Sequence, residues 1–242
     1  MDAHVLDALV NGWVGARVRG SLGQSWPVAI SVTVDDVRAA REVLRGVARE
    51  TPLRPARWLA EKVGGPVDLK CENLQRAGSF KIRGAYTRIS RLSEGERARG
   101  VVAASAGNHA QGVALAAKIL GIKSTVFMPV GAPLPKVSAT RGYGAEIIFT
   151  GSTIDECLVA ARAFEAETGA VLIHPFDHPD IVAGQGTCGL EILERTDPRR
   201  QAEEPDEASR IALLVHVVLA EGDETFVVQR VVALAACDRD SA

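Results

Sequence analysis

Hydrophobic and polar positions change their spacing several times along the 242 residues. Residues 1–32 show no clear period, and we expect a separate N-terminal extension there. After Thr33, a candidate N-cap, the apolar residues Val37, Ala40, Leu44 and Val47 recur at helical intervals. This spacing predicts an amphipathic helix that starts near residue 33 and is ended by the prolines at 52 and 55.

Further along, short apolar runs alternate with helical patterns. A short strand is expected at 67–72, and the apolar runs are 101–104, 124–129, 145–150 and 171–173. Helices are expected from Lys81, from His109, over 132–144 and over 153–169. Strand, loop and helix repeating in this way predict an α/β fold with parallel sheets covered by helices. Ligands in such folds bind where the strands end, which places residues 105–109 at the functional edge of a sheet.

The pattern changes again near Arg195. Residues 195–210 are nearly all charged, polar or proline, which is typical of a solvated linker. Residues 211–220 form an apolar run of ten residues, too short to cross a bilayer. We expect no membrane partner.

Composition narrows the function further. The formal net charge is −2 and aromatic residues make up 5% of the chain. The sequence therefore predicts neither a basic surface nor a base-stacking surface, and nucleic acid is disfavoured as a partner. The chain has 4 cysteines and no CxxC pair, which indicates free thiols in a reducing, cytoplasmic setting.

The segment Gly78–Gly84, with the sequence GSFKIRG, is the first candidate for chemistry. Lys81 stands at a predicted helix start after a flexible glycine turn, where its amine could form an imine with an aldehyde cofactor. Phe80 beside it offers an apolar face for a flat ring. Taken alone, the segment is weak evidence, because a lysine beside a phenylalanine is usually a surface residue next to a core residue.

The second candidate is Ser105–Gly112, with the sequence SAGNHAQG, which follows an apolar strand and opens a helix. Backbone N–H groups at a helix start suit an anionic group such as a carboxylate. Ser105 or Asn108 acting only as the helix cap is the alternative, and it is preferred if the first segment is ignored.

A third segment runs from His174 to Thr187, HPFDHPDIVAGQGT. His174 and His178 beside two aspartates suggest a metal, but the two prolines disfavour a ligand-bearing helix, so we expect a loop lining the cleft and no metal. The glycine pattern at 184–189 matches GxGxxG but does not follow a strand directly, so dinucleotide binding is disfavoured.

Together, the three segments resemble the threonine dehydratases, that is, the threonine (serine) ammonia-lyases of the tryptophan-synthase-like pyridoxal-phosphate family. The resemblance covers about residues 34–194. Relatives that make cysteine or cystathionine typically carry GNTG where this chain has residues 107–110, and threonine synthases carry Asp in place of Ile82. Both groups are therefore disfavoured.

The resemblance implies roles for individual residues. Lys81 would be the Schiff-base lysine that also removes the α-proton, Phe80 would pack on the pyridoxal-phosphate ring, and Asn108 would bond the ring hydroxyl. The substrate-carboxylate loop would consist of Ser105, Ala106, Gly107, Asn108 and His109.

Serine racemases carry a hydroxyl where this chain has Ala106, so elimination to a 2-oxo acid and ammonia is favoured over racemisation. A homo-oligomer acting in amino-acid metabolism, with isoleucine biosynthesis as one setting, is implied as well.

The resemblance stops after residue 194. The family continues into a strand and a tetraglycine loop around the cofactor phosphate, and no such glycine run follows Arg195 here. We therefore predict an N-terminal extension (1–32), the first part of a large domain (33–84), a small α/β domain (85–190) and a divergent tail (191–242). The alternative to a lyase is a catalytically inactive, truncated remnant with an incomplete large domain.

Overall fold

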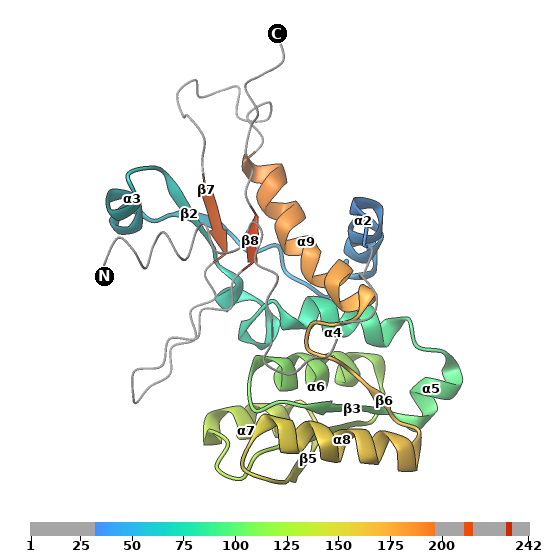
Figure 1. Ribbon diagram of the computed structural model, residues 1–242. Helices are drawn as coiled ribbons and strands as arrows, with labels where there is room; N and C mark the ends of the chain where they lie inside the picture. The colour runs from blue at the N-terminus through green and yellow to red at the C-terminus, as the bar shows by residue number, and fades with distance from the viewer. Residues whose placement is uncertain (1–31, 197–210, 215–230, 234–242) are drawn as a thin grey trace, which may run out of the picture. The chain divides into compact units, whose positions relative to one another are not determined.

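The computed structural model describes residues 32–196 and two strand segments, 211–214 and 231–233, within the unit Ser31–Ala242 (Figure 1). The predicted extension and most of the predicted linker and tail lie outside these residues. The elements are, in chain order, α2 (Val34–Val43), β1 (Leu53–Pro55), α3 (Arg57–Val63), β2 (Val67–Lys70), the 3-10 helices Glu72–Leu74 and Arg76–Gly78, α4 (Lys81–Ser90), α5 (Glu94–Arg99), β3 (Val101–Ala104), α6 (Asn108–Leu120), β4 (Ser124–Met128), α7 (Leu134–Gly142), β5 (Glu146–Phe149), α8 (Ile154–Thr168), β6 (Val171–Leu172), α9 (Pro179–Thr196), β7 (Ile211–Leu214) and β8 (Val231–Ala233).

One sheet is fully parallel, with the strand order β5-β4-β3-β6, as the alternating pattern predicts. Successive side chains of β3 alternate between its faces. Val101 and Ala103 pack in one core cluster with residues of α4 and α6, whereas Val102 packs with Cys157 and Ala161 of α8. The sheet is therefore covered on both faces, and Figure 1 shows α6 and α8 on opposite sides of it.

The second sheet differs from the prediction, because it is mixed. Its order is β1-β2-β7-β8, and only β2 and β7 are parallel neighbours. The prolines at 52 and 55 do not simply end a helix: α2 has already ended at Val43, and Leu53–Pro55 forms the edge strand β1. An edge strand tolerates proline because its unpaired side needs no N–H donor.

Helix α2 begins as expected. The hydroxyl of Thr33 accepts a hydrogen bond from the Asp36 backbone N–H, and the Asp36 carboxylate accepts one from the Thr33 N–H at 2.8 Å. This reciprocal cap satisfies two backbone donors at the helix start. The bond from the backbone of Thr33 is the main reason that the pKa of Asp36 lies below its ordinary value.

Helices α4 and α9 cross at a close glycine contact. A Cβ added to Gly184 would lie 2.6 Å from the Arg83 carbonyl oxygen and 2.8 Å from the Cα of Gly84. The glycines of the 184–189 pattern thus sit inside the long helix α9, where they form no strand-to-helix turn of the kind that binds dinucleotides.

We expect Gly184→Ala to lower the free energy of unfolding by about 1–3 kcal/mol, because backbone atoms of α4 must move. Gly189→Ala is the matched control, since a Cβ there meets nothing within 4 Å and alanine favours a helix. Urea unfolding of both variants compares them. Equal stabilities would show that the crossing tolerates a methyl group.

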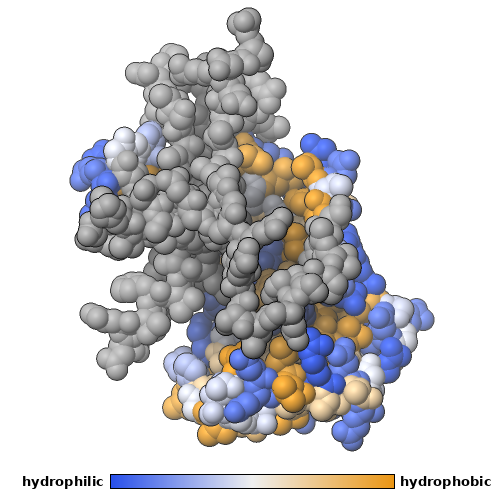
Figure 2. Space-filling view, in the orientation of Figure 1, coloured by the Kyte–Doolittle hydropathy of each residue, from blue (hydrophilic) through white to orange (hydrophobic). Residues whose placement is uncertain are grey.

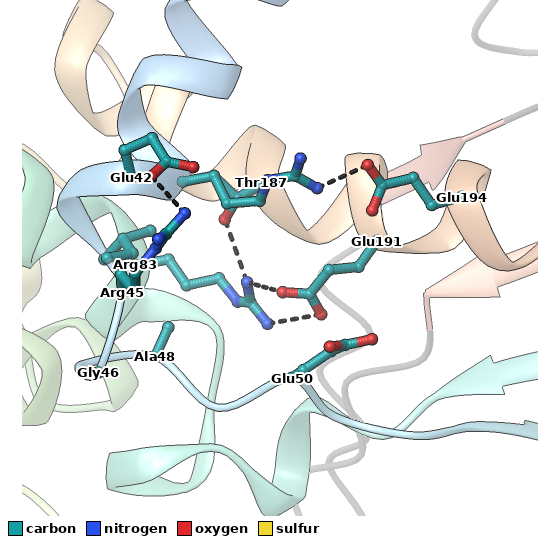
Figure 3. A pocket seen from close by; sticks show the side chains of 11 residues that line it. Glu42, Arg45, Gly46, Ala48, Glu50, Arg83, Thr187, Glu191 and Glu194 are labelled. Carbon is teal, nitrogen blue, oxygen red and sulfur yellow. Dashed lines mark hydrogen bonds and ion pairs between the residues drawn. The ribbon is translucent and has the colours of Figure 1, made fainter.

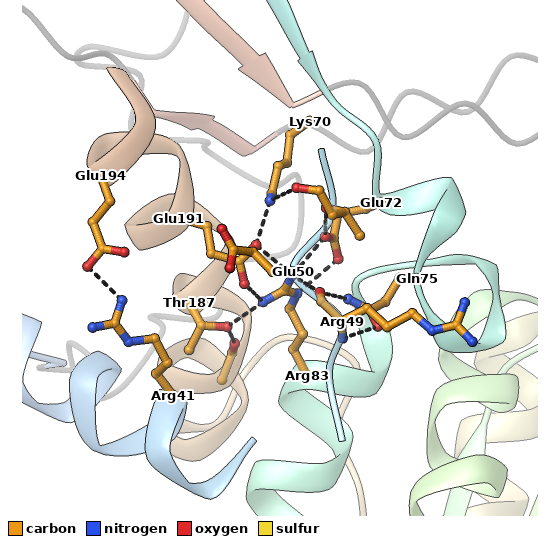
Figure 4. A network of polar contacts seen from close by, with 12 residues as sticks. Arg41, Arg49, Glu50, Lys70, Glu72, Gln75, Arg83, Thr187, Glu191 and Glu194 are labelled. Atoms are coloured by element: carbon orange, nitrogen blue, oxygen red, sulfur yellow. Dashed lines mark hydrogen bonds and ion pairs between the residues drawn. The ribbon is translucent and has the colours of Figure 1, made fainter. Parts of the chain in front are cut away.

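A buried cluster of charged groups fixes α4 to β2 and α9 (Figure 4). Arg83 donates from Nε and Nη2 to the two carboxylate oxygens of Glu72, at 2.9 and 2.8 Å, and from Nη1 to Glu191 at 2.6 Å. Lys70 donates to the Glu191 carboxylate and to the Thr51 carbonyl. Burial lowers the pKa of Arg83, but the bonds and charges of Glu72 and Glu191 outweigh this effect and raise it.

A cavity of about 320 Å³ opens beside this cluster, between residues of α2, α4 and α9 (Figure 3). The charged groups around it pair with one another: Arg41 with Glu194, Arg45 with Glu42, and Arg83 with Glu191. Lys81 does not line it. Because these three arginines are already paired with carboxylates, the cavity does not indicate a binding site for an anionic ligand.

Figure 2 shows hydrophobic side chains at the surface in the region of α9, and Leu193 on this helix is 46% exposed. None of the helices in the described ranges is long and apolar enough to span a bilayer. Cys71, Cys157 and Cys188 carry free thiols, as predicted, while Cys237 lies outside the described residues.

Candidate active site

Lys81 is the first residue of α4, and it is buried, with 5% of its surface exposed. Its Nζ donates a hydrogen bond to the Pro175 carbonyl at 2.9 Å and lies 5.0 Å from the centroid of the Phe80 ring. Burial lowers the pKa of this amine from its ordinary 10.5 to about 8. Roughly a tenth of the amine is therefore neutral at pH 7, and only the neutral form is nucleophilic.

The predicted anion-binding loop lies at the start of α6. Gly107 is the N-cap and makes no side-chain cap bond, while the Ser105 hydroxyl accepts from the Gly107 N–H at 3.1 Å. Neither Ser105 nor Asn108 is therefore the helix cap that the alternative interpretation required. The Ser105 hydroxyl stabilises the turn of the loop. The backbone amides in the first turn of the 13-residue helix α6 form a site that favours negative charge.

The His109 side chain is held in the interior. It is 5% exposed, and its Nε2 lies 2.8 Å from the Ile173 carbonyl, at the end of β6. Burial lowers its pKa to about 4, so the ring is neutral at pH 7 and Nε2–H is the donor. His109 ties the loop to the sheet, whereas the family resemblance places it among the residues that hold the substrate.

The third segment lies beside Lys81. The Pro175 carbonyl accepts hydrogen bonds from both Lys81 Nζ and Gln185 Nε2, the latter at 3.2 Å. His174 Nδ1 accepts from the Asp177 backbone N–H at 2.7 Å, and His178 Nδ1 accepts from Asp180. Both histidines thus shape the loop, and nowhere in 32–196 do three or more candidate ligands gather around a metal position.

A glycine brings the first two segments into contact. A Cβ added to Gly112, in α6, would lie 3.0 Å from the Lys81 carbonyl carbon and 3.1 Å from the Lys81 Cβ. The backbone that carries the lysine therefore rests directly on α6, one turn beyond the predicted anion-binding loop.

Two polar side chains near this loop were given no role by the sequence motifs. Lys136 of α7 donates from Nζ to Asn108 Oδ1 at 3.0 Å. Gln111, also on α6, is 7% exposed, and its buried Nε2 has no partner among the described residues. A buried donor without a partner costs about 1–3 kcal/mol, which a polar ligand at this position would recover.

Comparison with known proteins gives the family. Residues 44–210 match the profile of the pyridoxal-phosphate dependent enzymes. This match covers more than half of the chain. The chain belongs to the pyridoxal-phosphate dependent enzyme family.

Relatives within this family agree with the threonine dehydratase resemblance. An L-threonine ammonia-lyase from Thermotoga maritima is 55% identical over 163 residues, which are 67% of this chain and 41% of that protein. The L-threonine dehydratase TdcB of Escherichia coli, described as catabolic, is 44% identical over 165 residues, covering 68% of this chain and 50% of the relative. The chain thus spans half or less of the length of these relatives.

Solved structures support the fold. Maize serine racemase superposes with a TM-score of 0.65 and 39% identity, over 68% of this chain and 50% of its own. The processed form of threonine deaminase isoform 2 from Solanum lycopersicum superposes with a TM-score of 0.61 and 36% identity, over 73% of this chain and 55% of its own. The expected tryptophan-synthase-like α/β fold is therefore confirmed.

The described residues of this pyridoxal-phosphate family member fit part of the cofactor. The buried amine of Lys81 suits an aldehyde, and the unpartnered Gln111 donor together with the α6 start suits anionic oxygens. The sequence carries no glycine run for the cofactor phosphate after residue 195, and most of that stretch lies outside the described residues.

Proposed function

We propose that the chain is a pyridoxal-phosphate-dependent L-threonine (or L-serine) ammonia-lyase, which converts the hydroxy amino acid to a 2-oxo acid and ammonia. The observation that carries the proposal is the buried Lys81 amine, with its pKa of about 8, beside the start of α6. The similarity to L-threonine ammonia-lyases favours this enzyme over an inactive remnant.

Pyridoxal phosphate, when bound, stabilises the negative charge that develops at the α-carbon of an amino acid as its proton leaves. Lys81 would hold the cofactor and accept this proton, and Phe80 would pack against the ring. Asn108 would donate to the ring oxygen. The amides of the 105–109 loop would hold the substrate carboxylate, which fixes the α-proton toward the lysine.

Loss of the β-hydroxyl as water completes the elimination, and hydrolysis then returns one water and releases ammonia, so the net change is amino acid to 2-oxo acid and ammonia. We further propose a cytoplasmic homo-oligomer in amino-acid metabolism. Threonine degradation is one setting, since the Escherichia coli relative is described as catabolic, and isoleucine biosynthesis is the setting that the sequence resemblance implies.

Incubation of the purified chain with pyridoxal phosphate and L-threonine tests the proposal. We expect the 2-oxo acid to exceed any D-amino acid by about 100-fold, because the methyl group of Ala106 can donate no proton from the opposite face. Oxo-acid detection and chiral chromatography measure the two products.

The control is Ala106→Ser, assayed under the same conditions. Serine supplies the missing hydroxyl, so the share of D-amino acid should rise in this variant only. Dominant racemisation by the unchanged chain would overturn the elimination assignment, and the absence of any product would favour the inactive remnant.

A further inference from the structure

Lys136 stands where a helix disfavours a cation. It lies in the first turn of α7, where its backbone N–H donates to the Pro133 carbonyl at 2.9 Å, and no acidic residue accompanies it in that turn. The positive end of the helix dipole therefore disfavours a lysine there. A residue placed against a local preference is often placed for function.

The ammonium group of Lys136 is also half-buried, and it forms no ion pair with any residue that the structure describes. Burial lowers its pKa. Its described side-chain contact is the bond to Asn108 Oδ1 at 3.0 Å. The cluster shown in Figure 4 pairs its buried cations with carboxylates, whereas Lys136 is directed at a neutral amide.

This bond determines how the Asn108 amide is turned. An ammonium group has donors and no acceptor, so the amide atom that faces it must be the oxygen. With Oδ1 facing Lys136, the amide atom on the opposite side is the donor Nδ2, which suits a ring oxygen carrying negative charge. If the amide turned around, its oxygen would face that ring oxygen and repel it.

Packing holds Lys136 in place relative to α6. Its neighbour Val137 is 4% exposed and belongs to one core cluster with Ala110 and Ala114 of α6. The first turns of α6 and α7 are therefore fixed to each other. A side chain supported in this way can orient another one within the tolerance that a binding site needs.

We propose that Lys136 is a positioning residue, which fixes the Asn108 amide so that its nitrogen faces the cofactor ring. The proposal rests on pyridoxal phosphate binding at Asn108, as the proposed function has it. Lys136 acts through Asn108, so its loss matters only while the amide is present.

A double-mutant cycle on cofactor affinity tests this coupling. Pyridoxal phosphate is titrated into the parent chain, Lys136→Met, Asn108→Ala and the double variant, and binding is followed by absorbance. We expect each single variant to raise the dissociation constant about tenfold, or about 1.4 kcal/mol. The double variant should match the single ones instead of reaching about 100-fold, since both changes remove one interaction.

Two further variants sharpen the result. Lys136→Arg keeps a donor for Oδ1 and should stay within about threefold of the parent. Lys118→Met is the matched control: Lys118 bonds the Gly142 carbonyl at 3.3 Å from the last turn of α6, and its loss should leave the dissociation constant unchanged.

Any of three results would overturn the proposal. The dissociation constant of the double variant could rise by the product of the two single effects, that of Lys136→Met could stay unchanged, or the parent chain could fail to bind pyridoxal phosphate. The titration needs no substrate, so it is separate from the reaction assay. A chain that binds pyridoxal phosphate but does not convert threonine refutes the proposed function and leaves the role of Lys136 intact.

Discussion

Lys81→Met is expected to lower the turnover of L-threonine by about 10⁴-fold, because the variant loses both its attachment to the cofactor and its proton acceptor. The measurement is oxo-acid formation at saturating cofactor.

Borohydride reduction of the parent chain with pyridoxal phosphate, followed by peptide mapping, should label Lys81. Label on another lysine would refute the assignment, and Lys118→Met, at the far end of α6, should keep full turnover.

The same variant separates lost chemistry from lost folding. Burial lowers the folded-state pKa of Lys81 from 10.5 to about 8, so between these values the unfolded chain binds more protons and stability rises with pH. Below pH 8 the charged amine therefore opposes folding by up to about 3 kcal/mol. Lys81→Met should consequently be at least as stable as the parent at pH 7. A less stable variant would mean that its inactivity reports misfolding.

Arg83→Met is expected to lower the free energy of unfolding by about 3–5 kcal/mol. Glu72 is 0% exposed, and removal of Arg83 leaves its buried carboxylate without the opposite charge. Urea unfolding of the apoprotein measures the change.

Arg38→Met provides the comparison for this result. Arg38 pairs with Asp35 at 2.9 Å, but both side chains are mostly exposed, and such pairs contribute at most about 1 kcal/mol. Similar losses in the two variants would show that the cluster around Arg83 does not depend on burial.

The sequence predicted the parallel sheet and its helices because each apolar run there is short and bounded by glycine or polar residues. The predicted helix starts at Lys81 and near His109 agree with α4 and α6. The mixed sheet was not predicted, because the proline-containing segment of β1 was interpreted as the end of a helix, and β7 and β8 come from the tail, where strand and helix patterns do not alternate. Without that alternation, the sequence does not show whether a neighbouring strand runs parallel or antiparallel.

The site was predicted in part. Lys81, Phe80 and Asn108 stand out in motifs that occupy short stretches of chain. Lys136 lies in a helix with no conspicuous motif, and only the packing of α7 on α6 brings it to Asn108. The interior position of His109 was missed for a similar reason, since its partner Ile173 is 64 residues away.

The contact at Gly112 limits how this site can adjust to its substrate. Because α6 already touches the backbone of Lys81 there, these two elements cannot move closer, and any side chain at position 112 would push them apart. A shift of about 1 Å between reacting groups can cost 100-fold in rate, so this distance has little freedom. In the proposed reaction, space for the extra methyl group of threonine, compared with serine, would therefore have to come from elements other than these two helices. The loop around Pro175 contacts Lys81 Nζ, so we expect substitutions in that loop to change the preference between the two amino acids.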